Sequence, residues 1–99
     1  MLVVPSDRSV DRFWAATANI SRGGLFIQTE VAIPLFTEIR TKIMLRDGPT
    51  IQAKARVVRC EKGGLGCCFV HIAEPYERSF NSWLGRTGGL KPIAGTIDD

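Results

Sequence analysis

Residues 39–58 read IRTKIMLRDGPTIQAKARVV and contain the clearest secondary-structure signal of the chain. Apolar and polar side chains alternate along both halves of it, and the dipeptide Asp47-Gly48, extended by Pro49 and Thr50, separates the halves. Alternation with a period of two predicts half-buried β-strands, and Asp-Gly is typical of the turn in a β-hairpin. The stretch therefore predicts an antiparallel hairpin with one apolar face and one basic face.

The basic face of this hairpin carries five cations. They are Arg40, Lys42, Arg46, Lys54 and Arg56. A row of cations can bind a nucleotide or a nucleic acid, and it can equally form a solvated strand face that discourages aggregation. Nucleic-acid binding is better supported where aromatic side chains are interleaved for stacking, and none is interleaved with these cations. We favour the solvated surface, and nucleic acid is not expected as a partner.

Strand and turn patterns flank the hairpin on both sides. Short apolar or β-branched runs predict strands at residues 1–5, 12–20, 25–29 and 65–72. The pair Gly23-Gly24 predicts a turn, because glycine adopts positive φ without steric cost. Pro34 interrupts residues 30–38, which we expect to form a loop.

One helix is expected after the last strand. Tyr76, Phe80, Trp83 and Leu84 have the spacing of a single helical stripe. We place this helix at residues 75–85, where it packs on the sheet. About six strands and one C-terminal helix predict a mostly β domain, either a small antiparallel barrel or a sandwich.

The composition is that of one small globular domain. With 44% hydrophobic and 23% charged residues among 99, the chain can bury one core but has little room for a separate catalytic domain. Residues 87–99 are rich in glycine and lack periodicity, so we expect a domain at 1–86 and a flexible tail after it. The net charge of +3 favours an anionic partner only as a tendency. No apolar run reaches the length of a membrane span and no leader pattern is visible, so a cytoplasmic location is expected.

The sequence contains no pattern typical of catalysis or of a metal site. His71 is the single histidine, and no serine or carboxylate constellation accompanies it. Cys60, Cys67 and Cys68 lack the spacing of a four-ligand zinc site, and neighbours on a strand point to opposite faces. We interpret the three thiols as small buried hydrophobic groups in a reducing cytosol. The chain is not expected to be an enzyme, or to hold a metal or a cofactor.

A second motif precedes the hairpin. Residues 19–27 read NISRGGLFI, which resembles the (D/N)xSxxGG motif of the PilZ family. Residues 64–69, GLGCCF, resemble the glycine-flanked late strand of that family, and the order of expected elements agrees over residues 3–85. The resemblance implies a split β-barrel of about six strands with one C-terminal helix. It also implies that this barrel binds cyclic di-GMP at its surface and signals to a partner protein.

The resemblance assigns short polar and basic residues to the ligand. They are Asn19, Ser21, Arg22, Gly23 and Gly24, with Arg8 and Arg12 as clamps. Asn and Ser offer hydrogen-bonding groups, and paired glycines let backbone N–H groups form a concavity for an anion. The arginine fork matches phosphate oxygens and the O6/N7 edge of guanine. The same Asn, Ser and Gly-Gly are also ordinary turn residues, so the motif can persist without a ligand.

The arginine motif of the family has an unusual place in this chain. Ligand-binding PilZ domains carry RxxxR before their first strand, and residues 8–12, RSVDR, match it literally. In the family two strands and a turn separate RxxxR from the (D/N)xSxxGG turn, whereas here only residues 13–18 intervene before Asn19. In one alignment, therefore, Arg8 and Arg12 are the ligand arginines and the first strand is missing.

In the second alignment, residues 1–5 are the first strand and residues 6–11 are the turn that follows it. We favour this alignment because it keeps the barrel whole. RSVDR is then a solvated turn and the family's RxxxR is absent, which weakens binding by roughly a few hundred-fold, since each charge-assisted contact contributes about 1.5–3 kcal/mol. Arg22, Arg40 or Arg56 would compensate in part.

Two functions are compatible with the sequence. The first is a non-enzymatic PilZ-type receptor or adaptor, in which cyclic di-GMP orders the N-terminal segment over the barrel and changes the surface shown to a partner. Alanine at both Arg8 and Arg12 is then expected to abolish binding. The second is a degenerate PilZ domain that binds no nucleotide and acts as a protein-interaction module in motility or surface-attachment machinery. Phe13 or Trp14 would provide its docking surface.

Overall fold

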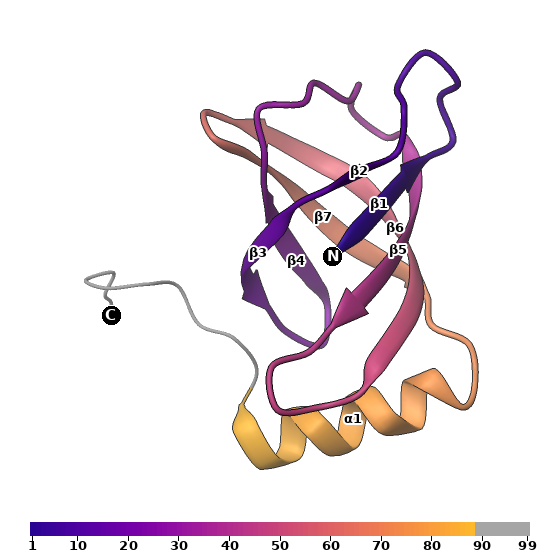
Figure 1. The fold of residues 1–99 in the computed structure, drawn as a ribbon, viewed down its shortest axis with the longest axis vertical. Helices are drawn as coiled ribbons and strands as arrows, with labels where there is room; N and C mark the ends of the chain where they lie inside the picture. Colours follow the sequence, from indigo (N-terminus) through magenta and orange to yellow (C-terminus); the bar gives the residue numbers. More distant parts are fainter. Residues whose placement is uncertain (89–99) are drawn as a thin grey trace.

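Residues 1–88 of the chain are described by a computed structural model. They form seven antiparallel strands and one helix (Figure 1). In chain order these are β1 (Leu2–Pro5), β2 (Phe13–Trp14), β3 (Ala16–Ile20), β4 (Gly24–Gln28), β5 (Glu38–Met44), β6 (Thr50–Glu61), β7 (Gly64–His71) and α1 (Tyr76–Thr87). The mostly β architecture with one C-terminal helix confirms the fold class expected from the sequence.

The hairpin predicted around Asp47-Gly48 is the centre of the sheet. Strands β5 and β6 pair from Glu38 opposite Arg56 to Met44 opposite Thr50. Their apolar positions point into the core, and the buried set on this hairpin is Ile39, Thr41, Ile43, Leu45, Ile51, Ala53, Ala55 and Val57. The Thr41 hydroxyl, buried among them, donates a hydrogen bond to the Ala53 carbonyl at 3.1 Å. The period-two pattern therefore correctly predicted which face is inside.

The sheet is curled because one segment forms both of its ends. The strand order is β2-β1-β5-β6-β7-β4-β3, so β2 and β3 lie at opposite ends although Ala15 alone separates them. The Ala15 N–H donates to the Met1 carbonyl at 2.9 Å, and the terminal ammonium of Met1 donates to the Ala15 carbonyl at 2.7 Å. In Figure 1 the chain runs from β2 beside β1 directly into β3 beside β4. A strand expected as one piece at residues 12–20 is thus two, which raises the strand count from about six to seven.

The N-terminal segment follows the second of the two alignments. Leu2 and Val3 face Trp14 and Phe13 on one side, and Leu2–Pro5 pairs with β5 on the other. Strand β1 is hydrogen-bonded on both edges without a ligand, so the ordering of the N-terminal segment by a ligand stays a prediction that concerns the turn at residues 6–12 and not the strand. Val3 is fully buried, which explains why the apolar start of the chain belongs to the core.

Helix α1 closes one end of the barrel beneath the β5–β6 turn (Figure 1). Phe80 and Trp83 are buried, and the indole Nε1–H of Trp83 donates to the Arg46 carbonyl at 2.9 Å. The Phe80 ring also meets Phe69 of β7 edge-on, with 5.5 Å between the ring centroids. The predicted apolar stripe is therefore the surface that holds the helix on the sheet.

The helix ends later than the sequence suggested. It continues through Gly85 to Thr87, and Gly88 terminates it with φ of 76° and an N–H bond to the Leu84 carbonyl at 2.7 Å. Positive φ is accessible to glycine without steric cost, so Gly88 is the stop signal that was overlooked. The expected tail at 87–99 otherwise lies outside the described residues.

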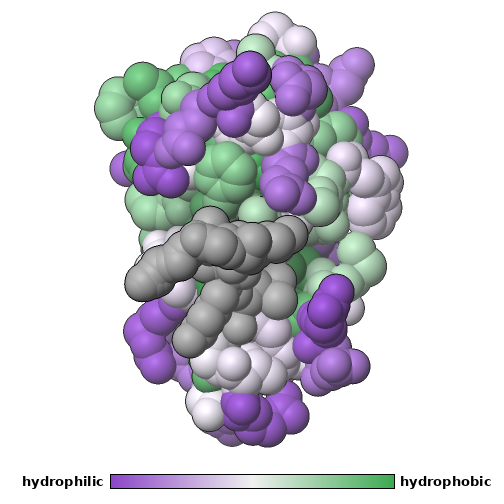
Figure 2. All heavy atoms as spheres, turned by 90° about the vertical axis from the view of Figure 1, so that its left-hand side faces the viewer, coloured by the Kyte–Doolittle hydropathy of each residue, from purple (hydrophilic) through white to green (hydrophobic). Residues whose placement is uncertain are grey.

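On the face shown in Figure 2, polar side chains gather at the upper and lower ends, and hydrophobic side chains are visible mainly in the upper half. Among residues 1–88, no helix has the length and apolarity that a membrane crossing requires.

Candidate functional site

The NISRGG motif forms the end of β3 and the turn into β4. The Ser21 N–H donates to the Gly24 carbonyl at 2.9 Å, and the Gly23 carbonyl accepts from the Phe69 N–H of β7 at 2.9 Å. Neither glycine has positive φ, so the sequence-based reason for the pair was wrong. Gly24 is needed because a Cβ there would overlap the Cys67 carbonyl, whereas a Cβ at Gly23 would meet nothing within 4 Å.

This difference between the two glycines predicts unequal costs for the same substitution. Gly24→Ala is expected to destabilise the domain by about 1–3 kcal/mol, because overpacking forces β4 away from β7. Gly23→Ala, the matched control, is expected to change the free energy of unfolding by less than about 0.5 kcal/mol. Urea unfolding of both variants measures the difference. Equal costs would show that strand proximity does not select the glycine at position 24.

Two β-bulges aim side chains at this motif. Ala18 is the extra residue between the pairs of Thr17 and Asn19 with β4, and Val58 is the extra residue between the pairs of Val57 and Arg59 with β7. A bulge shifts the alternation of the strand by one residue and is common beside binding sites. Asn19 and Arg59 therefore both follow a bulge directly.

After these bulges, four residues form one row across four strands. Asn19 pairs with Phe26, Phe26 with Gly66, and Gly66 with Arg59. Residues directly opposite each other have side chains on the same face of a sheet. Asn19 and Arg59 consequently project from the same side of the barrel, one at each end of the row.

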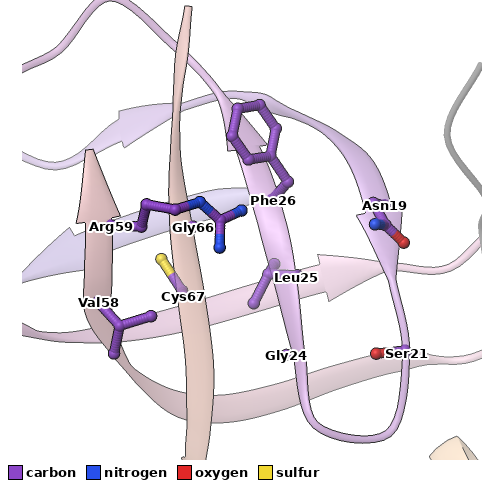
Figure 3. A pocket seen from close by; sticks show the side chains of 9 residues that line it. All are labelled: Asn19, Ser21, Gly24, Leu25, Phe26, Val58, Arg59, Gly66 and Cys67. Atoms are coloured by element: carbon purple, nitrogen blue, oxygen red, sulfur yellow. The ribbon is translucent and has the colours of Figure 1, made fainter. Parts of the chain in front are cut away.

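Gly66 lets the Arg59 side chain extend along that row. A Cβ at Gly66 would lie 2.8 Å from the guanidinium carbon of Arg59, so any other residue would displace it. In Figure 3 the guanidinium reaches over β7 toward β4. Its Nε–H donates to the Glu61 carboxylate in an exposed ion pair, which leaves its terminal nitrogens available for a further acceptor.

These residues line a pocket of about 170 Å³. Its lining, shown in Figure 3, is Asn19, Ser21, Gly24, Leu25, Phe26, Val58, Arg59, Gly66 and Cys67. Three residues expected from the motif, Asn19, Ser21 and Gly24, are brought together there, and Gly23 lies in the adjoining turn. The pocket combines an amide, a hydroxyl, close-approach backbone and a guanidinium, a set suited to a phosphate or to the edge of a guanine.

Cys67 lies at the base of the pocket and is buried, as expected for a structural thiol. Burial raises the pKa of the Cys67 thiol to about 12, neighbouring Cys68 and Cys60 add to the rise, and Arg59 opposes it. By contrast Cys60 is exposed, so the expectation that all three thiols are buried is wrong. Its Sγ contacts the Ile33 carbonyl at 3.5 Å.

The raised pKa of Cys67 predicts that the stability of the domain depends on pH. The folded pKa of Cys67 exceeds its ordinary value of 9.0, so the unfolded chain loses this proton first. The stability that Cys67 contributes is complete below pH 9 and is lost as the pH rises toward 12.

We expect iodoacetamide at pH 8 to modify Cys60 in the native domain and Cys67 only after denaturation, as peptide mass spectrometry would reveal. Native labelling of Cys67 at the rate of Cys60 would contradict this.

Arg8 and Arg12 lie in the turn between β1 and β2, at the other end of the segment from Ser21. From Phe13 to Ile20 the chain is extended, and seven residues at about 3.3 Å each span about 23 Å. In Figure 1 this turn is at the top and the β3–β4 turn is near the lower end of the barrel. Asp7 organises the turn by accepting hydrogen bonds from the N–H and hydroxyl of Ser9 at 2.9 and 2.6 Å, which lower the pKa of Asp7. The structure does not bring these arginines to the pocket, and their role as clamps stays a prediction.

Arg22, which follows Ser21 in the motif, connects the turn to the helix. Its terminal nitrogen donates to the Asn81 Oδ1 of α1 at 3.2 Å, across an exposed surface. Arg56 lies on the outer face in the row that runs from Gly24 through Cys68, and Glu38 accepts its hydrogen bond at 3.3 Å. Arg22 thus lies within the motif, whereas Arg56 is two strands away from Gly24.

Arg59 is the residue that sequence reasoning missed. The strand was expected to alternate only through residue 58, so no position in the site was predicted for Arg59. The adjacent apolar pair Val57-Val58 breaks the alternation and is a signal for a bulge. Within residues 1–88, no three His, Cys, Asp or Glu side chains are grouped as a metal site.

The fold and the site define a small β-barrel module with a polar surface pocket at a glycine-rich turn. The family model described as the PilZ domain matches residues 1–86. The chain therefore belongs to the PilZ domain family, whose members are in general non-enzymatic receptors and adaptors for cyclic di-GMP that act through partner proteins. No curated protein and no solved structure matches the chain.

Proposed function

We propose that this domain is a non-enzymatic receptor or adaptor that binds cyclic di-GMP at the β3–β4 turn and signals to a partner protein. The observation that carries the proposal is the convergence of Asn19, Ser21 and Gly24 of the motif with Arg59 of β6 around one pocket. Arg59 comes from a strand that is remote from the motif in the sequence. It supplies a positive charge for a ligand that carries two negative phosphates.

The size of the pocket suggests how much of the ligand enters it. Pockets for drug-sized ligands have volumes of about 300–1,000 Å³, and this pocket has about 170 Å³. Cyclic di-GMP has two guanines and two phosphates, so one phosphate with its neighbouring guanine occupies the pocket. The other half would lie over the outer surface, near the β3–β4 turn that carries Arg22.

Arg22 gives a route from the site to the helix. Its guanidinium is held by Asn81 in the described structure, and a phosphate is a stronger, charged acceptor than an amide oxygen. Ligand binding would draw Arg22 away from Asn81 and free the surface of α1. A partner that senses this surface would then distinguish the bound from the free domain.

Calorimetric titration of the purified domain with cyclic di-GMP at moderate salt tests the proposal. Saturable binding at micromolar or tighter affinity is expected, and Asn19→Ala/Ser21→Ala is expected to weaken it. The double variant Arg8→Ala/Arg12→Ala separates the two alignments. If this double variant retains its affinity, the ligand is bound by the pocket residues. If the affinity is lost, the ligand is bound by the arginines of the distant turn. Absence of heat from folded protein would remove the nucleotide function.

A second function is favoured by one specific observation. Arg8 and Arg12 lie at the far end of the barrel, and Trp14 next to them is 66% exposed. A PilZ domain without clamp arginines but with an exposed aromatic side chain suits a protein-interaction module that needs no nucleotide. Partner binding that is equal with and without cyclic di-GMP would support this function over the first.

A further inference from the structure

The outer face of β2, β1, β5 and β6 combines apolar and cationic residues in ordered rows. One row runs Trp14, Leu2, Lys42 and Gln52, and the next runs Val4, Arg40, Lys54 and His71. Directly paired residues share a face, so Trp14 stands on the same face as the cations. The sequence had suggested that no aromatic residue accompanies them, because Trp14 is distant from them along the chain.

This face is hollowed along β1 and β5. A trough of about 260 Å³ is lined by Leu2, Val4, Arg40, Thr41, Lys42 and Gln52. A second hollow of about 230 Å³ continues it past Val4 and Arg40 to Pro5, Ser6, Glu38 and Lys54. The two share Val4 and Arg40, so they form one continuous groove, which we call the β1–β5 groove.

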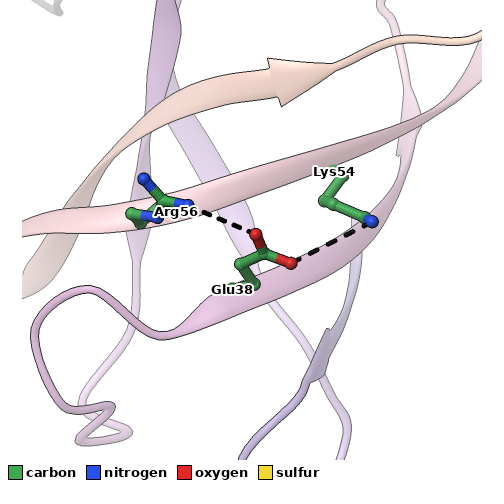
Figure 4. Close-up of polar contacts among 3 residues, drawn as sticks. All are labelled: Glu38, Lys54 and Arg56. Carbon is green, nitrogen blue, oxygen red and sulfur yellow. Dashed lines mark hydrogen bonds and ion pairs between the residues drawn. The ribbon is translucent and has the colours of Figure 1, made fainter.

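The charges of the groove are poorly balanced. Glu38 pairs with Lys54 at 4.0 Å and with Arg56 at 3.3 Å, as Figure 4 shows. Among residues 1–88, Arg40 and Lys42 take part in no ion pair, and both are exposed. One carboxylate therefore faces four cations, and the two cations beside the apolar floor are uncompensated.

We propose that the β1–β5 groove is a docking site for an acidic, amphipathic segment of a partner protein. Apolar side chains of the segment would contact Leu2, Val4 and Trp14, and its carboxylates would pair with Arg40 and Lys42. An acidic partner is favoured because its carboxylates would complement the unpaired charges of Arg40 and Lys42. The inference rests on the proposed adaptor role, in which the domain acts through another protein, and it gives that partner a chemistry and a place.

A protein segment fits this face better than a nucleic acid does. Single-stranded nucleic acids are held by several aromatic side chains on which successive bases stack, and this face offers Trp14 alone. Met44, two residues after Lys42 on β5, is also exposed on this face. Tryptophan, methionine and arginine on one patch are the composition of protein–protein interfaces.

Binding of a synthetic Glu-Leu repeat peptide tests the inference, with a Lys-Leu repeat and oligo(dT) as competing probes. We expect the Glu-Leu peptide to bind, to shift the emission of exposed Trp14, and to lose affinity as salt rises. Trp83 is buried and should contribute a constant background. Lys42→Glu is expected to weaken binding by about tenfold or more, and Trp14→Ala should also weaken it.

Lys62→Glu is the matched control, because it makes the same charge change in the exposed β6–β7 turn outside the groove. Equal losses in Lys42→Glu and Lys62→Glu, no binding of the Glu-Leu peptide, or tighter binding of oligo(dT) would each overturn the inference. Titration of Lys42→Glu with cyclic di-GMP keeps the two proposals apart, since the nucleotide affinity should be unchanged. A wild-type domain that binds the peptide but not cyclic di-GMP would refute only the nucleotide function.

Discussion

Replacement of Arg59 by alanine is expected to lower the affinity for cyclic di-GMP by about 10- to 150-fold. Arg59 is the cation of the pocket, and a hydrogen bond to a charged group contributes about 1.5–3 kcal/mol, which corresponds to that range of affinity. The side chain is exposed, so its removal should leave the fold intact. Calorimetric titration of wild type and variant at the same salt concentration measures the change.

Three further variants determine whether the effect belongs to the geometry of Arg59. Arg59→Lys keeps the charge but loses the planar fork, so it should recover only part of the affinity. Glu61→Gln removes the competing carboxylate and should raise the affinity. Gly66→Ala adds a Cβ where the guanidinium now passes and should lower it. An Arg59→Ala variant that binds like wild type would exclude the proposed pocket as the nucleotide site.

The sequence predicted the barrel well wherever the pattern was periodic. The strands around Asp47-Gly48 were recognisable because alternate side chains enter a single core, and burial follows that alternation from Ile39 to Val57. The break at Ala15 was not recognisable, because nothing in the segment RFWAATANI marks where its hydrogen bonds move from β1 to β4. Strand partners are set by the closure of the whole sheet, and a local pattern does not contain that information.

The candidate site was only partly predictable for the same reason. Asn19, Ser21 and Gly24 lie in one motif, so a resemblance could group them. Arg59 reaches them through a row of pairs that exists only after two bulges have shifted the register. The literal match of RSVDR to the arginine motif, in contrast, did not predict where these residues lie in the fold. The structure places them in a turn at the end of the barrel opposite the β3–β4 turn.

Truncation of Trp83 to alanine is expected to cost about 3–5 kcal/mol of folding free energy, the usual range for a buried tryptophan. Trp83 is 1% exposed, it stacks near Phe80 with 6.3 Å between the centroids, and its Nε1–H satisfies the Arg46 carbonyl at 2.9 Å. Gly48 lies with Arg46 in the β5–β6 turn, and a Cβ at Gly48 would overlap the Trp83 indole. Native proteins have a total stability of about 5–15 kcal/mol, so this variant should lose a large fraction of the stability of the domain.

The other tryptophan provides the control for that experiment. Trp14 is 66% exposed, and Trp14→Ala should change the stability by no more than about 0.5 kcal/mol. Urea unfolding followed by circular dichroism measures both variants without relying on tryptophan fluorescence. If Trp83→Ala unfolded at the same urea concentration as Trp14→Ala, α1 would be an appendage and not part of the core. The proposed route from Arg22 through Asn81 would then lack a fixed helix on which to act, because movement of Arg22 would change the position of α1 only if the helix were held against the barrel.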